Sequence, residues 1–155
     1  MNVQIINPFI QGTQSILESV CGEKTKLGKL YLKVSPFTGE RVSIIIGIVG
    51  DVKGQVIFSL NISSACSIAS KMMMGMPVTE LDELAKSAIS ELTNMILGHV
   101  ATIFSEMGMV TDITPPSLLM GENIQISTTK MNTVCIPLEM SDGTNFEIDV
   151  ALQQK

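Results

Sequence analysis

The segment from residue 80 to residue 107 constrains the fold of this chain more than any other. Its apolar residues recur every three or four positions, the spacing of one face of an α-helix with about 3.6 residues per turn. Thr79 followed by Asp82 gives a capping-box-like start, and Gly108 supplies a stop. The stripe that must face a core consists of Leu81, Ala85, Ala88, Ile89, Leu92, Ile96, Val100, Ile103 and Met107. We therefore expect one long amphipathic helix.

Two further helices are indicated by weaker patterns. Residues 3–21 carry apolar positions at broadly helical spacing, and Gly22 follows as a stop. A shorter helix, capped by Ser63 or Ser64, is expected to end at Gly75.

The strands are predicted from β-branched and alternating stretches. "KLYLKV", "RVSIIIGIV" and "GQVIFSL" are separated by short turns and predict a three-stranded meander. Later strands are expected at "VTDI", "SLLM", "ENIQIS", "NTVCIPLEM" and "FEIDVAL", the last two joined by the turn "SDGT". This order of elements predicts an α+β fold with two layers, a mostly antiparallel sheet covered on one face by three helices. We expect residues 1–155 to form a single domain, because a chain of this length can bury roughly two-thirds of its unfolded surface in one core.

Charge and cysteine content exclude several classes of function. The net charge is -5 and the basic residues form no extended cluster, which argues against nucleic-acid binding. Cys21, Cys66 and Cys135 include no CxxC spacing, and His99 is the single histidine, so neither a disulfide framework nor a zinc site is expected.

No targeting or membrane segment is recognisable. The first residues, "MNVQIINPFIQG", lack a basic region and a cleavage pattern, and the longest apolar run, "IIIGIV", is too short to span a bilayer. We therefore expect no membrane insertion and a cytoplasmic location.

A second, narrow stripe of the long helix carries polar side chains. Ser87, Glu91, Asn94 and Gly98 are three or four residues apart, so they share one face opposite the apolar stripe and can act together on one bound group. Gly98 removes a side chain at a cost of about 1 kcal/mol relative to alanine, which lets another surface come close. From spacing alone an ordinary solvated helix face remains the simpler interpretation.

The start of the chain faintly echoes the second half of this helix. In the alignment that superposes the glycines, Ile5 and Pro8 stand where the long helix has its glutamate and asparagine. A shift of one residue brings Gln4 and Asn7 to these places, but the glycines then disagree and glutamine supplies no negative charge.

The surroundings of the polar stripe make the pattern more specific. "LDELAKSAISELTNM", followed by "DITPPS", resembles the signature of the CheC/CheX/FliY family of chemotaxis phosphatases: Ser or Asp, three residues, Glu, two residues, Asn and a distant Pro. Pro115 or Pro116 would be the family proline. The similarity extends to "NPFI", "GDVKGQVIFSL", "MMMGM" and the final paired strands. The single polar pair, with a degenerate first copy, resembles the CheX branch, which implies a pseudo-duplicated CheC/CheX-like fold.

The resemblance implies hydrolysis of the phosphoaspartate of a CheY-type response regulator, as part of chemotaxis or another two-component pathway. Such phosphoryl transfer has a loose transition state, so positioning a water is the main task left for a catalyst. Asn94 suits this role because a carboxamide accepts a hydrogen bond from water and donates one to a phosphoryl oxygen. Glu91, by the same resemblance, would pair with the regulator's active-site lysine, and Ser87 would border the contact. The resemblance implies no cofactor of its own and Mg²⁺ held by the partner.

The resemblance also implies a homodimer in which edge strands pair. Pro137 in "NTVCIPLEM" cannot donate to a sheet ladder, so it would need a bulge or an edge. One alternative function is a non-catalytic adaptor that binds a response regulator or flagellar component. A small-molecule binding domain is a third option, for which the sequence shows no convergent polar pocket.

Overall fold

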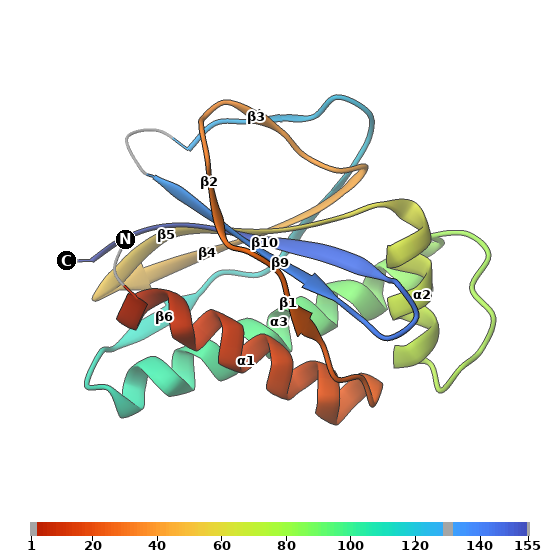
Figure 1. Cartoon of the computed structure of the whole chain (residues 1–155), viewed down its shortest axis with the longest axis horizontal. Helices are drawn as coiled ribbons and strands as arrows, with labels where there is room; N and C mark the ends of the chain where they lie inside the picture. Colours follow the sequence, from red (N-terminus) through yellow and green to blue (C-terminus); the bar gives the residue numbers. More distant parts are fainter. Residues whose placement is uncertain (1–2, 129–131, 155) are drawn as a thin grey trace.

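Two layers make up the structure, a computed structural model that describes residues 3–128 and 132–154. The helices are α1 (Val3–Cys21), α2 (Ile62–Met72) and α3 (Glu83–Glu106). The strands are β1 (Lys26–Leu27), β2 (Tyr31–Lys33), β3 (Phe37–Thr38), β4 (Val42–Gly50), β5 (Val52–Leu60), β6 (Thr111–Ile113), β7 (Ser117–Met120), β8 (Gln125–Ile126), β9 (Thr133–Glu139) and β10 (Asn145–Gln154). Helices α1 and α3 lie beneath one face of the sheet, and α2 lies at one end (Figure 1). The expected α+β fold class is confirmed.

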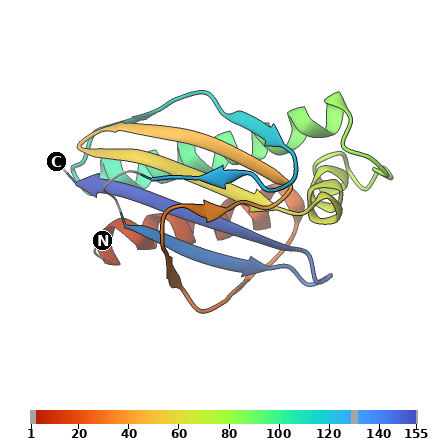
Figure 2. The same cartoon turned by 90° about the horizontal axis from the view of Figure 1, so that it is seen from above.

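The main sheet is antiparallel throughout its described pairs, in the order β1-β9-β10-β5-β4-β6 (Figure 2). Strand β2 also pairs with β9, and β7 also pairs with β4. Strands β3 and β8 form a small separate ladder above the face that the helices leave uncovered (Figure 1). The long strands β4, β5, β9 and β10 alternate inward and outward positions, and their inward side chains join those of all three helices in one hydrophobic core.

The expected three-stranded meander is wrong in one respect. Strands β4 and β5 form the predicted hairpin, but β2 pairs with β9, with Tyr31 opposite Cys135. The alternation of apolar and polar residues in "KLYLKV" predicts a strand but not the strand with which it pairs. Its partner, β9, lies about one hundred residues further along the chain.

The sheet has the symmetry of a duplication. At its centre β5 pairs with β10, β4 and β9 flank this pair, and each outer position holds two short strands. Strands β1 and β2, which follow α1, pair with β9 of the second half, while β6 and β7, which follow α3, pair with β4 of the first half. Each half therefore completes the sheet edge of the other.

Helices α1 and α3 run antiparallel and touch closely. A Cβ atom built on Gly12 would lie 2.8 Å from Val100 Cγ2, so glycine is required where the helices approach. The rings of Phe9 and Phe104 meet edge to face, with centroids 5.8 Å apart.

The pattern of buried residues shows how α1 and α3 align with each other. The buried α1 residues Ile5, Ile6, Phe9, Thr13 and Leu17 correspond in order to the buried α3 residues Leu92, Thr93, Ile96, Val100 and Phe104. This is the alignment shifted by one residue from the one that superposes the glycines. Gln4 and Asn7, both exposed, are therefore the α1 counterparts of Glu91 and Asn94.

The helix starts differ from the expected ones. The N-cap of α3 is Asp82, whose side chain accepts a hydrogen bond from the Ala85 N–H, rather than Thr79. The N-cap of α2 is Asn61, which accepts from Ser64 N–H. Both caps are the last extended residue before the helix, a backbone property that composition alone does not show.

The buried stripe of α3 is rotated slightly from the predicted one. Leu97 and Phe104 are buried, whereas Met107, the C-cap residue, is exposed. Met107 lies just beyond the last residue of α3, and Gly108 follows with a φ of +85°, as expected for a helix stop.

Pro137 lies in β9, which is not an edge strand. It stands opposite Glu147 of β10, and on its other side β1 and β2 leave a gap between them. The Gly28 N–H donates to the Pro137 carbonyl across this gap at 2.9 Å. The missing N–H of the proline therefore faces an interruption in the neighbouring strand, which is how a proline is accommodated inside the sheet.

Candidate functional site

The four residues predicted as a polar stripe lie on one exposed face of α3, which we call the ridge. Ser87 and Glu91 are exposed, and Asn94 and Gly98 are half-buried. They lie opposite the side of the helix that packs on the sheet and on α1. The predicted polar stripe is therefore accessible to another molecule.

Neither Glu91 nor Asn94 has a side-chain hydrogen bond or ion pair to any part of the chain that the structure describes. Their neighbours on the helix are engaged: Thr93 Oγ1 donates to the Ser90 carbonyl at 2.8 Å, and Lys86 pairs with Glu83 at 3.2 Å. A carboxylate and a carboxamide one turn apart are thus both available to an external donor or acceptor.

Gly98 differs from Gly12 in its surroundings. A Cβ atom built on Gly98 would have no neighbour within 4 Å outside its own helix backbone, whereas Gly12 is confined by α1–α3 packing. The fold does not need glycine at position 98. Because Gly98 has no side chain, the helix surface is open one turn beyond Asn94.

The Pro115–Pro116 pair lies in the connection between β6 and β7, two short strands that both pair with β4 and contact α3. Leu118 and Ser90 line a common open hollow. Pro115 is exposed and Pro116 is half-buried. The prolines therefore lie in a connection between two strands that contact α3, and they are not part of the ridge.

The corresponding ridge of α1 presents Gln4 and Asn7. It has the carboxamide but no carboxylate, so it cannot form an ion pair with an ammonium group. The alignment of the two helices became evident only from burial, because the glycines in the sequence favoured a register one residue away.

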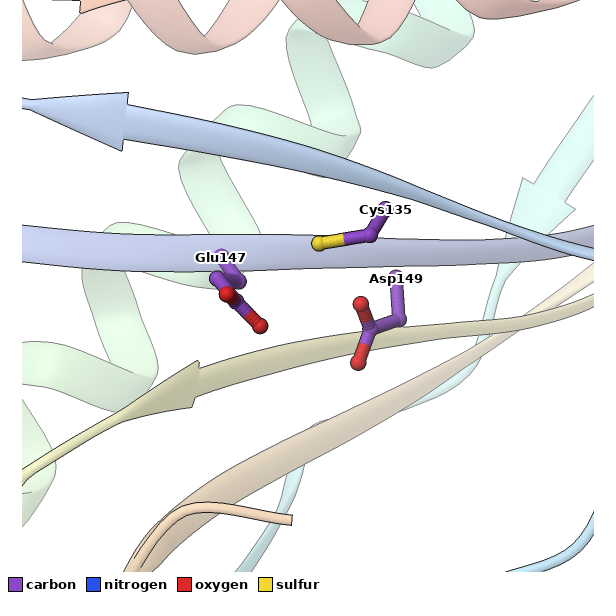
Figure 3. Close-up of side chains that lie close together, drawn as sticks. All are labelled: Cys135, Glu147 and Asp149. Carbon is purple, nitrogen blue, oxygen red and sulfur yellow. The ribbon is translucent and has the colours of Figure 1, made fainter. Parts of the chain in front are cut away.

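A second polar cluster, which the sequence did not reveal, lies on the sheet face away from the helices. Cys135 of β9 and Glu147 and Asp149 of β10 point toward one another there (Figure 3). The thiol sulfur and one oxygen of each carboxylate lie within 4.8 Å of one another, which is a donor set for a metal ion. Lys33 of β2 already engages both carboxylates, with Nζ 2.9 Å from Glu147 Oε2 and 3.0 Å from Asp149 Oδ2.

The ionisation of this cluster follows from burial and from Lys33. Burial raises the pKa of Asp149, which is fully buried. Burial alone would also raise the pKa of Glu147, but the hydrogen bond and charge of Lys33 outweigh it and lower that pKa. Burial raises the pKa of the Cys135 thiol to about 12, so the thiol stays protonated and unreactive at neutral pH. The Lys33 ammonium group occupies the position that a metal ion would take between these carboxylates, and its ion pairs hold β2 against the sheet.

The fold is α+β and pseudo-duplicated, and one exposed helix carries a carboxylate–carboxamide pair. This fold is that of the CheC/CheX-like proteins. A family model described as "Chemotaxis phosphatase CheX" matches residues 42–139. The chain belongs to this family.

Relatives match over nearly the whole length. The chain is 34% identical over 161 aligned residues to the "CheY-P phosphatase CheX" of Thermotoga maritima, covering 100% of this chain and 98% of the relative. The fold is similar to that of a chemotaxis protein CheX from Desulfovibrio desulfuricans, with a TM-score of 0.85, 26% identity and coverage of 99% and 100% of the two chains. It is also similar to a chain of the CheX-CheY-BeF3-Mg+2 complex from Borrelia burgdorferi, with a TM-score of 0.83, 29% identity and coverage of 99% and 100%.

None of the described helices is long and apolar enough to cross a membrane.

Proposed function

We propose that this protein is a phosphatase that hydrolyses the phosphoaspartate of a CheY-type response regulator. The observation that carries the proposal is the pair Glu91 and Asn94, one turn apart on the exposed ridge of α3 and without partners in the described chain. The relative from Thermotoga maritima is named a CheY-P phosphatase, and the similar protein from Borrelia burgdorferi was solved in complex with CheY.

Asn94 positions the attacking water. Its carboxamide oxygen accepts a hydrogen bond from the water and its NH₂ donates to a phosphoryl oxygen, so both reactants are held in line. The transition state is loose and needs little early proton removal, so a neutral group suffices. A negative charge at this position would oppose the anionic phosphoryl group.

Glu91 docks the ridge on the regulator. Its carboxylate pairs with the lysine of the regulator's phosphorylation site, and this ion pair sets the distance of Asn94 from the phosphorus. Glu91 is therefore a docking and positioning group rather than a general base. Mg²⁺ is carried by the regulator, and this protein contributes no cofactor of its own.

The remaining site residues support this contact. Ser87 borders it one turn before Glu91, and Gly98 clears the space beyond Asn94. Pro115 and Pro116 hold the β6–β7 connection beside the helix.

The alternative is an adaptor of the same family that binds a response regulator or a flagellar component without hydrolysis. An adaptor would need a docking group but no carboxamide aimed at a phosphoryl group. Retention of both Glu91 and Asn94 on the accessible ridge favours the phosphatase.

We also propose that the protein is a cytoplasmic homodimer. Sheet edges are suited to strand pairing between copies. Leu32 of β2, at such an edge, is 66% exposed, and Val34, the residue after this strand, is 83% exposed. Sedimentation analysis would give twice the monomer mass, and a monomer at high concentration would contradict this assembly.

The test follows phosphate loss from a phosphorylated CheY-type regulator with and without the protein. We expect the wild type to accelerate the loss, and Asn94→Ala and Asn94→Asp to abolish the acceleration, a fall of about 100-fold or more, while Asn94→Ala still binds. Glu91→Ala should weaken binding as well as slow turnover.

Asn7→Ala is the matched control, because Asn7 is the exposed counterpart of Asn94 on α1. It should leave the rate unchanged. If the wild type bound the phosphorylated regulator without accelerating phosphate loss, the adaptor function would replace the phosphatase. Unchanged rates in both Asn94 variants would reject the site.

A further inference from the structure

The ridge around Glu91 and Asn94 is too small to hold a protein partner by itself. A specific interface buries about 800 Å² on each partner, which corresponds to a patch with a radius of about 16 Å. Its centre is usually apolar, and a few buried apolar or aromatic contacts provide most of the affinity. The regulator must therefore cover more of α3 and its surroundings.

The strongly exposed, large apolar side chain of α3 nearest to the site lies toward the N-terminal end of the helix. Leu84 is 63% exposed, and it precedes Ser87 by three residues and Glu91 by seven. At about 1.5 Å per residue, Leu84 lies about 10 Å from Glu91 along the helix, inside the expected patch. In the other direction the ridge continues through polar Thr102 and Ser105.

The exposed apolar residues at the far end of α3 lie outside the patch. Met107 is 44% exposed and Val110 is 74% exposed. Met107 is sixteen residues beyond Glu91, about 24 Å along the helix axis. Among the described residues, the C-terminal end therefore offers no strongly exposed, large apolar side chain within reach of a regulator centred on the site.

An open hollow beside Ser87 extends the N-terminal surface. It lies between α3 and β7 and is lined by Glu83, Lys86, Ser87, Ser90, Leu118 and Met120. Met120 is 43% exposed, and the Glu83–Lys86 ion pair stands on the α3 side of the hollow. The hollow thus combines an apolar surface from β7 with hydroxyl groups of the site helix.

We propose that the response regulator binds over the N-terminal half of α3, with an apolar side chain from the rim of its phosphorylation site packed against Leu84 and Met120. This inference rests on the proposed function and names the second contact of the same complex. Leu84 is a docking residue that fixes affinity and partner choice, and it takes no part in the chemistry.

The test measures KM and kcat for the phosphorylated regulator with Leu84→Ser and Met120→Ser. Each variant should raise KM about five- to tenfold, the effect of removing one central apolar contact, and leave kcat within about twofold of the wild type. Leu84→Met keeps an apolar side chain and should restore most of the affinity. Val110 is also strongly exposed and lies just beyond the other end of the helix, so Val110→Ser should leave KM unchanged.

Binding can be measured without turnover in the Asn94→Ala background. There, Leu84→Ser should raise the dissociation constant by the same factor as it raises KM. An unchanged KM and dissociation constant for both Leu84→Ser and Met120→Ser would overturn the inference, as would a larger effect of Val110→Ser. A wild-type protein that fails to accelerate phosphate loss would instead overturn the proposed function, so the two failures are distinguishable.

Discussion

Gly98 lies on the exposed ridge of α3, where a Cβ atom built on it would meet no neighbouring atom within 4 Å. Glycine inside a helix costs about 1 kcal/mol relative to alanine. Since packing within the chain does not require this glycine, the partner's close approach is the reason that the proposed function offers for it.

We expect Gly98→Ala to stabilise the protein by about 1 kcal/mol and to raise KM for the phosphorylated regulator. Urea denaturation and steady-state kinetics measure the two effects. Gly12→Ala is the matched control and should destabilise the protein, because its Cβ would lie 2.8 Å from Val100 Cγ2. A Gly98→Ala protein with improved stability and an unchanged KM would show that nothing approaches there.

The N-terminus of α3, the helix that carries the site, is capped by a single residue. Asp82 has an extended backbone conformation, and its carboxylate accepts a hydrogen bond of 2.9 Å from the Ala85 N–H. Its negative charge also lies next to the positive end of the helix dipole. Thr79, three residues earlier, has no such contact in the described structure.

We expect Asp82→Ala to lower the free energy of unfolding by about 1 kcal/mol, while Thr79→Ala changes it by less than about 0.5 kcal/mol. Chemical denaturation of both variants measures the difference. The kcat of the folded Asp82→Ala protein should stay near that of the wild type, because Glu91 and Asn94 lie more than two turns further along the helix. Equal losses of stability in the two variants would contradict the assignment of the cap.

At the scale of the whole molecule, the two halves hold each other through the outer strands. Lys33 of β2, in the first half, reaches Glu147 and Asp149 of β10, in the second half. Its side chain is 13% exposed and that of Asp149 is fully buried, so this ion pair is shielded from water. Removing one partner of a buried pair leaves an uncompensated charge.

We expect Lys33→Met to destabilise the protein by about 3 kcal/mol at pH 7. Burial already raises the pKa of Asp149, and loss of the lysine charge raises it further, so the folded variant binds a proton more readily than the unfolded chain. Its stability should therefore increase as the pH falls from 7 toward the ordinary aspartate pKa of about 3.9. Urea midpoints at several pH values measure this.

The variant Lys33→Met with Asp149→Asn is the control, because it removes the buried charge together with its partner. It should lose less stability than Lys33→Met alone and should not gain stability on acidification through Asp149. Equal pH profiles for the single and double variants would contradict the role of Asp149.

The long site helix, its polar ridge and the four long strands could all be predicted from the amino-acid sequence. These features depend on periodicity within one segment: apolar residues three or four apart define which side of α3 is buried, and Glu91 and Asn94 follow on the other side. The family resemblance extended this local pattern to a fold and an expected chemistry. The roles of the individual site residues remain predictions.

Which distant segments pair with one another became evident only from the folded structure. The pairing of β2 with β9, the register between α1 and α3, and the cluster of Lys33 with Glu147 and Asp149 join residues that are roughly ninety to more than one hundred positions apart. A strand pattern shows that backbone hydrogen bonds must be made but not with which partner, and two helices related by duplication can be aligned with certainty only when burial shows which of their faces are equivalent.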